Sequence, residues 1–133
     1  MDFSHCTVTL EGDKDSETAG TAGLSYAVHG LPVSGVVESL RFVPYAAVTA
    51  HDTNYADISV ELDGTEIASE QTTTGDTGNL TAGTDIELAL TASGADLEVG
   101  AYSVFALKFT KAGTGVAVNG SVVARIRLDR VGS

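Results

Sequence analysis

Residues 52–64 read DTNYADISVELDG and contain the local pattern that decides the fold class. From Ala56 to Leu62, apolar residues occupy every second position, and acids and a serine occupy the positions between them. A period of two is typical of a strand with one buried face, because successive side chains point to opposite sides. Asp63-Gly64 then supplies a dipeptide that favours a two-residue hairpin turn. The stretch predicts a strand, a tight turn and the start of a second strand.

The same alternation recurs along the rest of the chain. Further strands are predicted at 3–10, at 22–29, within 36–49, and at 65–72, 84–91, 101–110 and 121–130. Glycine, asparagine and aspartate separate these segments, and such residues mark turns. About eight short antiparallel strands at this spacing predict an all-β fold, either a β-sandwich or a jelly roll.

In four of these strands the alternation also predicts which side chains face the core. The predicted inward residues are Ala56, Ile58, Val60, Leu62, Ile86, Leu88, Leu90, Ser103, Phe105, Leu107, Phe109, Val122, Ala124, Ile126 and Leu128. Segment 36–43 also fits a helical turn, but its β-branched residues and Pro44 favour a strand there.

Length and composition predict a single domain that covers residues 1–133. The chain has 43% apolar and 19% charged residues, which is a globular composition. The polar run at 11–23 predicts a flexible acidic loop, which separates residues 1–10 from the body. Residues 1–10 can form a strand of the same sandwich or an arm that reaches a neighbour, and the sequence leaves both open.

The formal net charge of −11 argues against nucleic acid or an anionic membrane as a partner, because both attract clustered Lys and Arg. The single cysteine, Cys6, excludes an internal disulfide framework. The start of the sequence lacks the basic and apolar segments of a secretion signal, and no apolar stretch is long enough to span a membrane. We therefore expect synthesis and use in a soluble compartment.

Asp52, Asn54 and Asp57 supply oxygen ligands at spacings that raise the question of a calcium loop. An EF-hand also needs a glycine at the bend, a bidentate glutamate and two flanking helices, which the pattern does not provide. A calcium site of another kind on a sandwich loop stays open. The other interpretation is that these side chains cap turns before a strand begins. We expect no metal and no cofactor.

Paired acids at Glu61 and Asp63, or at Asp85 and Glu87, have a spacing that suits glycoside hydrolysis. Acids on the outer face of a strand more often serve solvation, and the sequence offers no aromatic platform for a sugar. The three histidines are scattered, and the chain has neither a G-x-S-x-G elbow nor a phosphate-binding GK[ST] motif. The sequence predicts no catalytic residues and no enzyme.

The charges are distributed unevenly along the chain. Residues 1–100 hold 17 of the 18 acids, whereas residues 101–133 hold five of the seven bases. These charges can form cross-strand ion pairs within one subunit. Alternatively, a basic surface of one subunit can meet an acidic surface of the next in an oligomer. The residues assigned to such an oligomer interface are Lys108, Arg125, Arg127, Asp57, Glu61, Asp85 and Glu87.

Three segments follow one another in an order that resembles a known family: DTNYADISVELDGTEI, LTAGTDIELALT and LEVGAYSVFALKFTKAGTG. Over residues 36–131 the chain resembles the small jelly-roll capsid decoration, or head stabilisation, proteins of tailed bacteriophages. The shared positions are Pro44, Asp52 to Tyr55, Asp63-Gly64, Leu80 to Thr84, Val99-Gly100 and Lys111 to Gly115. Two departures are Ala101, where the family pattern often has an acid, and the acidic loop at 11–23.

The resemblance implies a non-enzymatic homotrimer on the outer surface of a virion, made in the host cytoplasm and clamping neighbouring subunits of the major capsid protein. In such a protein the N-terminal segment would carry binding, with Phe3, His5 and Val8 as candidate capsid contacts. The alternative is a carbohydrate- or receptor-binding β-sandwich module of a phage fibre or spike. Exposed loop aromatics would favour this alternative, and Tyr55 is the tyrosine that we expect to be most exposed.

Overall fold

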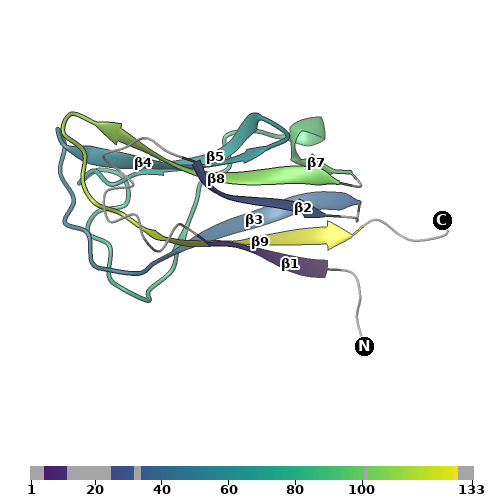
Figure 1. Ribbon diagram of the computed structural model, residues 1–133, viewed down its shortest axis with the longest axis horizontal. Helices are drawn as coiled ribbons and strands as arrows, with labels where there is room; N and C mark the ends of the chain where they lie inside the picture. The colour runs from purple at the N-terminus through teal and green to yellow at the C-terminus, as the bar shows by residue number, and fades with distance from the viewer. Residues whose placement is uncertain (1–4, 12–24, 32–33, 101, 129–133) are drawn as a thin grey trace.

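The computed structural model describes residues 5–11, 25–31, 34–100 and 102–128, which form two antiparallel β-sheets packed face to face (Figure 1). The first sheet has the order β1-β9-β3-β6, and β7 also pairs with β3; the second has the order β2-β8-β4-β5. The strands are β1 (His5–Glu11), β2 (Ser25–Leu31), β3 (Gly35–Pro44), β4 (Tyr55–Leu62), β5 (Thr65–Gln71), β6 (Ile86–Glu87), β7 (Glu98–Val99), β8 (Ser103–Ala112) and β9 (Gly120–Leu128). In the described part, a short 3₁₀ helix, η1 (Gly94–Leu97), precedes β7.

The strand order is that of a jelly roll. Most successive strands alternate between the two sheets, while the β4–β5 hairpin joins neighbours within one sheet. β6 pairs with β3 at Arg41 and Phe42, and β7 pairs with it at Gly35 and Val36, so both belong to one interrupted edge strand. Counted in this way, the described strands number eight and have the order of a double-sheet jelly roll. The predicted all-β, antiparallel fold of about eight strands is confirmed.

The core lies between the inner faces of the two sheets. All four predicted inward residues of β4 are at most 3% exposed, and the inward aromatic and leucine side chains of β8 are fully buried. Phe42 of β3 and Phe109 of β8 meet edge to face with ring centroids 5.9 Å apart, which joins the two sheets. Burying each such side chain contributes about 1.5–3 kcal/mol.

The predicted hairpin turn is present at Asp63 and Gly64. Their φ angles are 53° and 85°, and positive φ at both central positions is the type I′ geometry that suits a twisted hairpin. The backbone N–H of Asp63 donates to the carbonyl of Val104, and the N–H of Val104 donates to Asp63 Oδ1, each at 2.8 Å. These bonds fix the turn against β8.

The prediction of one continuous strand over 84–91 is wrong, although Leu88, one of its three predicted inward residues, is buried. The strand here, β6, covers only Ile86–Glu87, and Leu90 is 40% exposed. The chain leaves the first sheet after Leu88, whose N–H still donates to the carbonyl of Leu40 in β3, and Ala89 and Thr91 then make backbone hydrogen bonds to β5 of the second sheet. Because the segment crosses between sheets, its alternation in sequence does not correspond to one continuous strand face.

β1 is a strand of the sandwich that pairs with β9 over its whole length, from His5↔Arg127 to Glu11↔Ser121. The described part of residues 1–10 is therefore not an arm. Apart from Glu11, the predicted acidic loop at 11–23 lies outside the described residues. No helix in the described residues is long and apolar enough to cross a membrane.

The strand pairing shows which residues lie together at each of the two ends of the sandwich. We call one end the His5 end; it contains His5, Gly35, Val99 and Ser103. We call the other the far end; it contains Pro44, Tyr55, Ala112 and Gly120.

Candidate functional site

The DTNYAD stretch lies at the far end, where its polar side chains hold neighbouring loops. Both carboxylate oxygens of Asp52 accept hydrogen bonds from Thr74 Oγ1 at 2.8 Å, and Oδ1 also accepts one from the Thr74 N–H. These bonds, the backbone bond first, lower the pKa of Asp52. Asn54 Oδ1 accepts from the N–H of Thr114 at 2.9 Å. The stretch therefore connects three loops that are distant in sequence.

The local turn in this stretch is capped by a histidine. His51 Nδ1 accepts hydrogen bonds from the backbone N–H groups of Thr53 at 3.1 Å and Asn54 at 2.8 Å. Gly113 has φ +62° and lies against Asn54 so closely that a Cβ would overlap its side-chain oxygen. The prediction that Asp52 and Asn54 cap this turn is wrong. His51 caps the turn, and Asp52 and Asn54 bind other loops.

Asp57 differs from the two preceding oxygen donors. It lies on the outer face of β4, half-buried, and its buried Oδ1 has no hydrogen-bond partner. Burial raises its pKa, while a hydrogen bond from the Gln71 side chain acts in the opposite direction. Among the described residues, no three or more His, Cys, Asp or Glu side chains form a group that could hold a metal ion. Asp52 and Asn54 bind protein groups, each in a different loop.

Several charges assigned to an oligomer interface are paired within the chain. Lys108 Nζ lies 2.7 Å from Glu61 Oε2, which is a cross-strand pair between β8 and β4. Arg125 Nε lies 3.7 Å from Glu38 Oε1. Both pairs are at least partly exposed to solvent, and each is worth less than about 1 kcal/mol. These residues therefore form ion pairs within the subunit, and their assignment to an oligomer interface stays a prediction.

Two further acids assigned to the interface are Asp85, directly before β6, and Glu87, within β6. Asp85 forms an ion pair with Arg41, whose neighbour across the strands is Glu87. The hydrogen bond and charge of Arg41 lower the pKa of Asp85. Arg127 is exposed at the His5 end and lies opposite His5 in the β1–β9 ladder.

The three candidate capsid contacts have different positions. Phe3 lies outside the described residues. His5 begins β1, and its Nε2 lies 2.7 Å from Glu38 Oε1. Val8 is only 6% exposed and belongs to the core, because the alternation in β1 turns it inward. Its assignment as a surface contact is therefore corrected.

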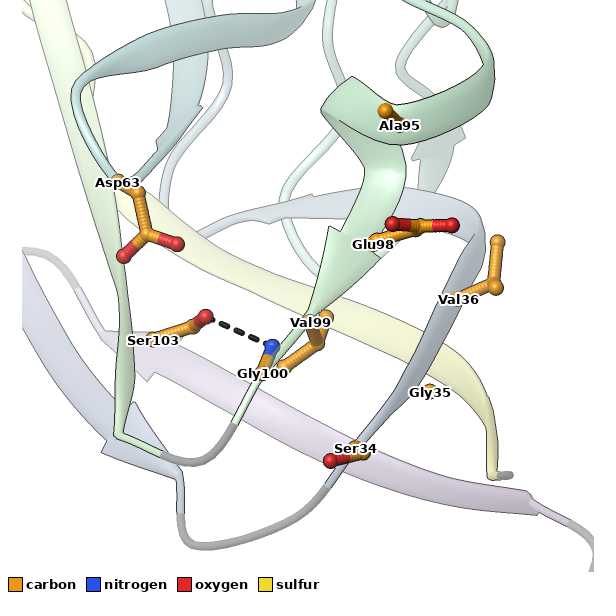
Figure 2. A pocket seen from close by; sticks show the side chains of 9 residues that line it. All are labelled: Ser34, Gly35, Val36, Asp63, Ala95, Glu98, Val99, Gly100 and Ser103. Carbon is orange, nitrogen blue, oxygen red and sulfur yellow. Dashed lines mark hydrogen bonds between the residues drawn. The ribbon is translucent and has the colours of Figure 1, made fainter. Parts of the chain in front are cut away.

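A cavity of about 490 Å³ opens at the His5 end, as Figure 2 shows. Its lining comes from the starts of β3 and β8, the β4–β5 turn, η1 and β7: Ser34, Gly35, Val36, Asp63, Ala95, Glu98, Val99, Gly100 and Ser103. The carboxyl groups of Asp63 and Glu98 stand on two sides of it (Figure 2). Ser103 Oγ accepts a hydrogen bond from the Gly100 N–H at 2.8 Å, which holds the turn before β8.

Tyr102 lies beside this cavity, directly before Ser103, and is 78% exposed. Its φ of 67° is a left-handed conformation that non-glycine residues rarely adopt. Tyr55, expected to be the most exposed tyrosine, is only partly exposed at the start of β4. Residue 102 continues the alternation of β8 in the sequence, so nothing in the pattern indicated that it leaves the strand.

A carboxyl pair on β5 and the following loop also escaped prediction. Glu70 Oε1 accepts from the Ala89 N–H at 3.2 Å, and Asp76 Oδ2 accepts from the Gln71 N–H at 2.7 Å. The side chains of Glu70 and Asp76 interact with each other, and two neighbouring carboxyl groups favour a shared proton over two negative charges. Burial first, and then the hydrogen bond to Asp76, raise the pKa of Glu70 to about 7.

This pair predicts a pH-dependent stability. The folded chain keeps the proton of Glu70 up to about pH 7, whereas the unfolded chain releases it near 4.5. The contribution is fully present below the lower value and is lost as the pH rises through the upper one. We expect the free energy of unfolding to fall by about 1 kcal/mol across this window, after allowance for solvent screening.

Glu70→Gln and Asp76→Asn should each remove this fall, because either change abolishes the need for a shared proton and keeps an acceptor oxygen. Urea unfolding at a series of pH values measures it. If the free energy of unfolding depended on pH in the same way in the original protein and in both variants, the shared proton would be contradicted.

Comparison with known proteins yields no family. No protein-family model matches the chain, and no curated protein matches it either. Among solved structures, the chain is similar to one from the structure of the infectious bursal disease virus Gx strain, with a TM-score of 0.39 and 17% identity. The match covers 96% of this chain and 37% of that one. A TM-score this low adds nothing to the fold that the strand order establishes.

Proposed function

We propose that this protein is a non-enzymatic structural component of a tailed-bacteriophage particle, which binds the outer surface of the capsid and stabilises it. The observation that carries the proposal is the jelly-roll strand order, combined with the turn pattern that the sequence shares with capsid decoration proteins. Jelly rolls occur in viral capsid domains, lectins and cupins. The sequence resemblance favours the first of these classes.

The shared turn pattern lies at turns or strand ends of the structure. Pro44 ends β3, Asp63-Gly64 forms the β4–β5 turn, and Val99-Gly100 leads into the turn before β8. After β8, Gly113 and Gly115 both have positive φ. The pattern therefore describes backbone geometry and not composition alone, which strengthens the resemblance.

The His5 end is the surface that we assign to capsid binding. β1 begins there with His5, directly after the N-terminal segment that contains Phe3. Tyr102 is exposed at the same end and offers a large aromatic side chain, the type that most often dominates a protein interface. Each copy would make a modest contact, and many copies on one lattice would hold the capsid subunits together.

Co-sedimentation with capsids that lack this protein tests the proposal. We expect the purified protein to pellet with such capsids in a saturable manner, and to bind poorly to capsids whose sites are already occupied. Bound protein should also raise the temperature at which the capsids release their contents, because a ligand of the assembled state stabilises that state. A protein that stays in the supernatant at all capsid concentrations would refute the proposal.

One observation favours a second candidate, a carbohydrate- or receptor-binding module. Exposed Tyr102 stands beside a cavity with carboxylates from Asp63 and Glu98, and sugars stack on aromatic rings while their hydroxyls donate to carboxylates. Retention on a glycan array that Tyr102→Ala abolishes, together with no capsid binding, would select this candidate.

A further inference from the structure

The four sheet edges of the sandwich differ in how well they are protected against pairing with another chain. β5 is covered by residues 89–91, which bond to Ile67 and Ser69. β6 and β7 contain two residues each, and the pairing of β2 with β8 has a register shift near its start. Covering, shortness and irregularity are the usual ways in which proteins protect an edge.

β1 has none of these protections among the described residues. Its seven residues pair with β9 in one continuous register, and β9 is its only strand neighbour in the described sheets. The strand reads HCTVTLE, with no proline or lysine and with β-branched residues at its centre. A regular edge strand of this kind presents a row of backbone groups that another strand can bind.

We propose that β1 pairs antiparallel with β1 of a second copy of the chain, about a twofold axis at Val8. In this register His5 lies opposite Glu11 of the second copy, and Thr7 lies opposite Thr9. Cys6 lies opposite Leu10, and Val8 lies opposite Val8. Threonines meet threonines and apolar residues meet apolar residues, so the strand is complementary to itself.

The faces of the strand agree with this register. Residues that become opposite each other have the same parity, so inward residues meet inward residues. Val8 and Leu10 are buried in the subunit, while Thr7 and Thr9 are exposed on the outer face. A shift by one residue would place core side chains opposite exposed threonines. The pair would join two four-stranded sheets into one continuous sheet with a closed twofold interface.

A pair of double substitutions tests the proposal by sedimentation velocity. The original protein should sediment as a dimer with twice its mass of 13.6 kDa. Thr7→Lys/Thr9→Lys places lysines opposite lysines and should raise the dissociation constant at least about tenfold. Thr7→Lys/Thr9→Glu places opposite charges together and should keep the dimer. Both positions are exposed, so neither variant should unfold the subunit, which circular dichroism checks.

A disulfide provides a second, independent readout of the register. In a Cys6→Ser background, Val8→Cys places the two new thiols directly opposite each other, at a Cα separation of about 4.5–5.5 Å that a disulfide can span. In the original protein the two Cys6 residues would be about 14 Å apart along the strands, which is too far. We expect a crosslinked dimer from the first protein under mild oxidation and none from the second.

The sequence resemblance implies a homotrimer, which would have three times the mass of the subunit and not twice that mass. A monomer or a trimer of the original protein would overturn the proposal. So would equal dimerisation of the two charge variants, or crosslinking through Cys6 and not through position 8. These measurements use no capsids, so their failure leaves the capsid-binding proposal to its own test.

Discussion

We expect Phe109→Ala to lower the free energy of unfolding by about 3–5 kcal/mol, the largest loss from a single substitution that we predict. Phe109 is fully buried on the inner face of β8 and meets Phe42 of the opposite sheet edge to face. Its removal takes away apolar burial and leaves a cavity that the paired strands cannot close. Such a loss is a large share of the stability of a domain of this size.

Urea unfolding measures this loss, and Val104→Ala on the same strand is the matched control. Val104 is exposed on the outer face of β8, so its truncation should change the unfolding free energy by less than about 0.5 kcal/mol. A double-mutant cycle with Phe42→Ala should show a coupling of about 0.5–1.5 kcal/mol for the ring pair. Similar losses for both single variants of β8 would mean that Phe109 does not pack as described.

Tyr102→Ala should weaken capsid binding by about 30-fold, which corresponds to about 2 kcal/mol. The side chain is exposed at the His5 end and makes little contact with the core, so its removal should leave the unfolding free energy nearly unchanged. Quantitative co-sedimentation gives the affinity and urea unfolding gives the stability.

Tyr45→Ala is the matched control. Tyr45 is also exposed, but it follows β3 at the far end. We expect this variant to bind capsids like the original protein. An equal loss of binding from both substitutions, or a loss from Tyr45→Ala alone, would contradict the assignment of capsid binding to the His5 end.

The alternation of apolar and polar residues predicted those strands in which one face packs against the core and the other faces outward. β4 keeps one face against the core along its whole length, and β8 does so from Ser103 to Phe109, so the inward positions of Ile58 and Phe105 followed from a period of two. The Asp63-Gly64 turn was predictable because its geometry is local and needs positive φ.

The features that escaped prediction depend on contacts between distant segments. Asp52 binds Thr74, which is 22 residues away, and no local pattern marks that partner. Leu90 continues an apolar alternation but follows the point where the chain passes from one sheet to the other. Burial, and then Asp76 in the loop that follows β5, raise the pKa of Glu70. In each case the tertiary arrangement decides, and the sequence shows only one of the two partners.

The position of the last two strands sets the order of events during synthesis. β8 lies between β2 and β4, and β9 lies between β1 and β3, so the second sheet lacks an inner strand until Ala112 has been made, and the first until Leu128 has been made. At about 5–20 residues per second, β1 waits on the order of ten seconds for its partner β9. The nascent chain therefore completes both sheets late, the second before the first, and a ribosome stalled before β9 would hold a chain that has no closed sandwich.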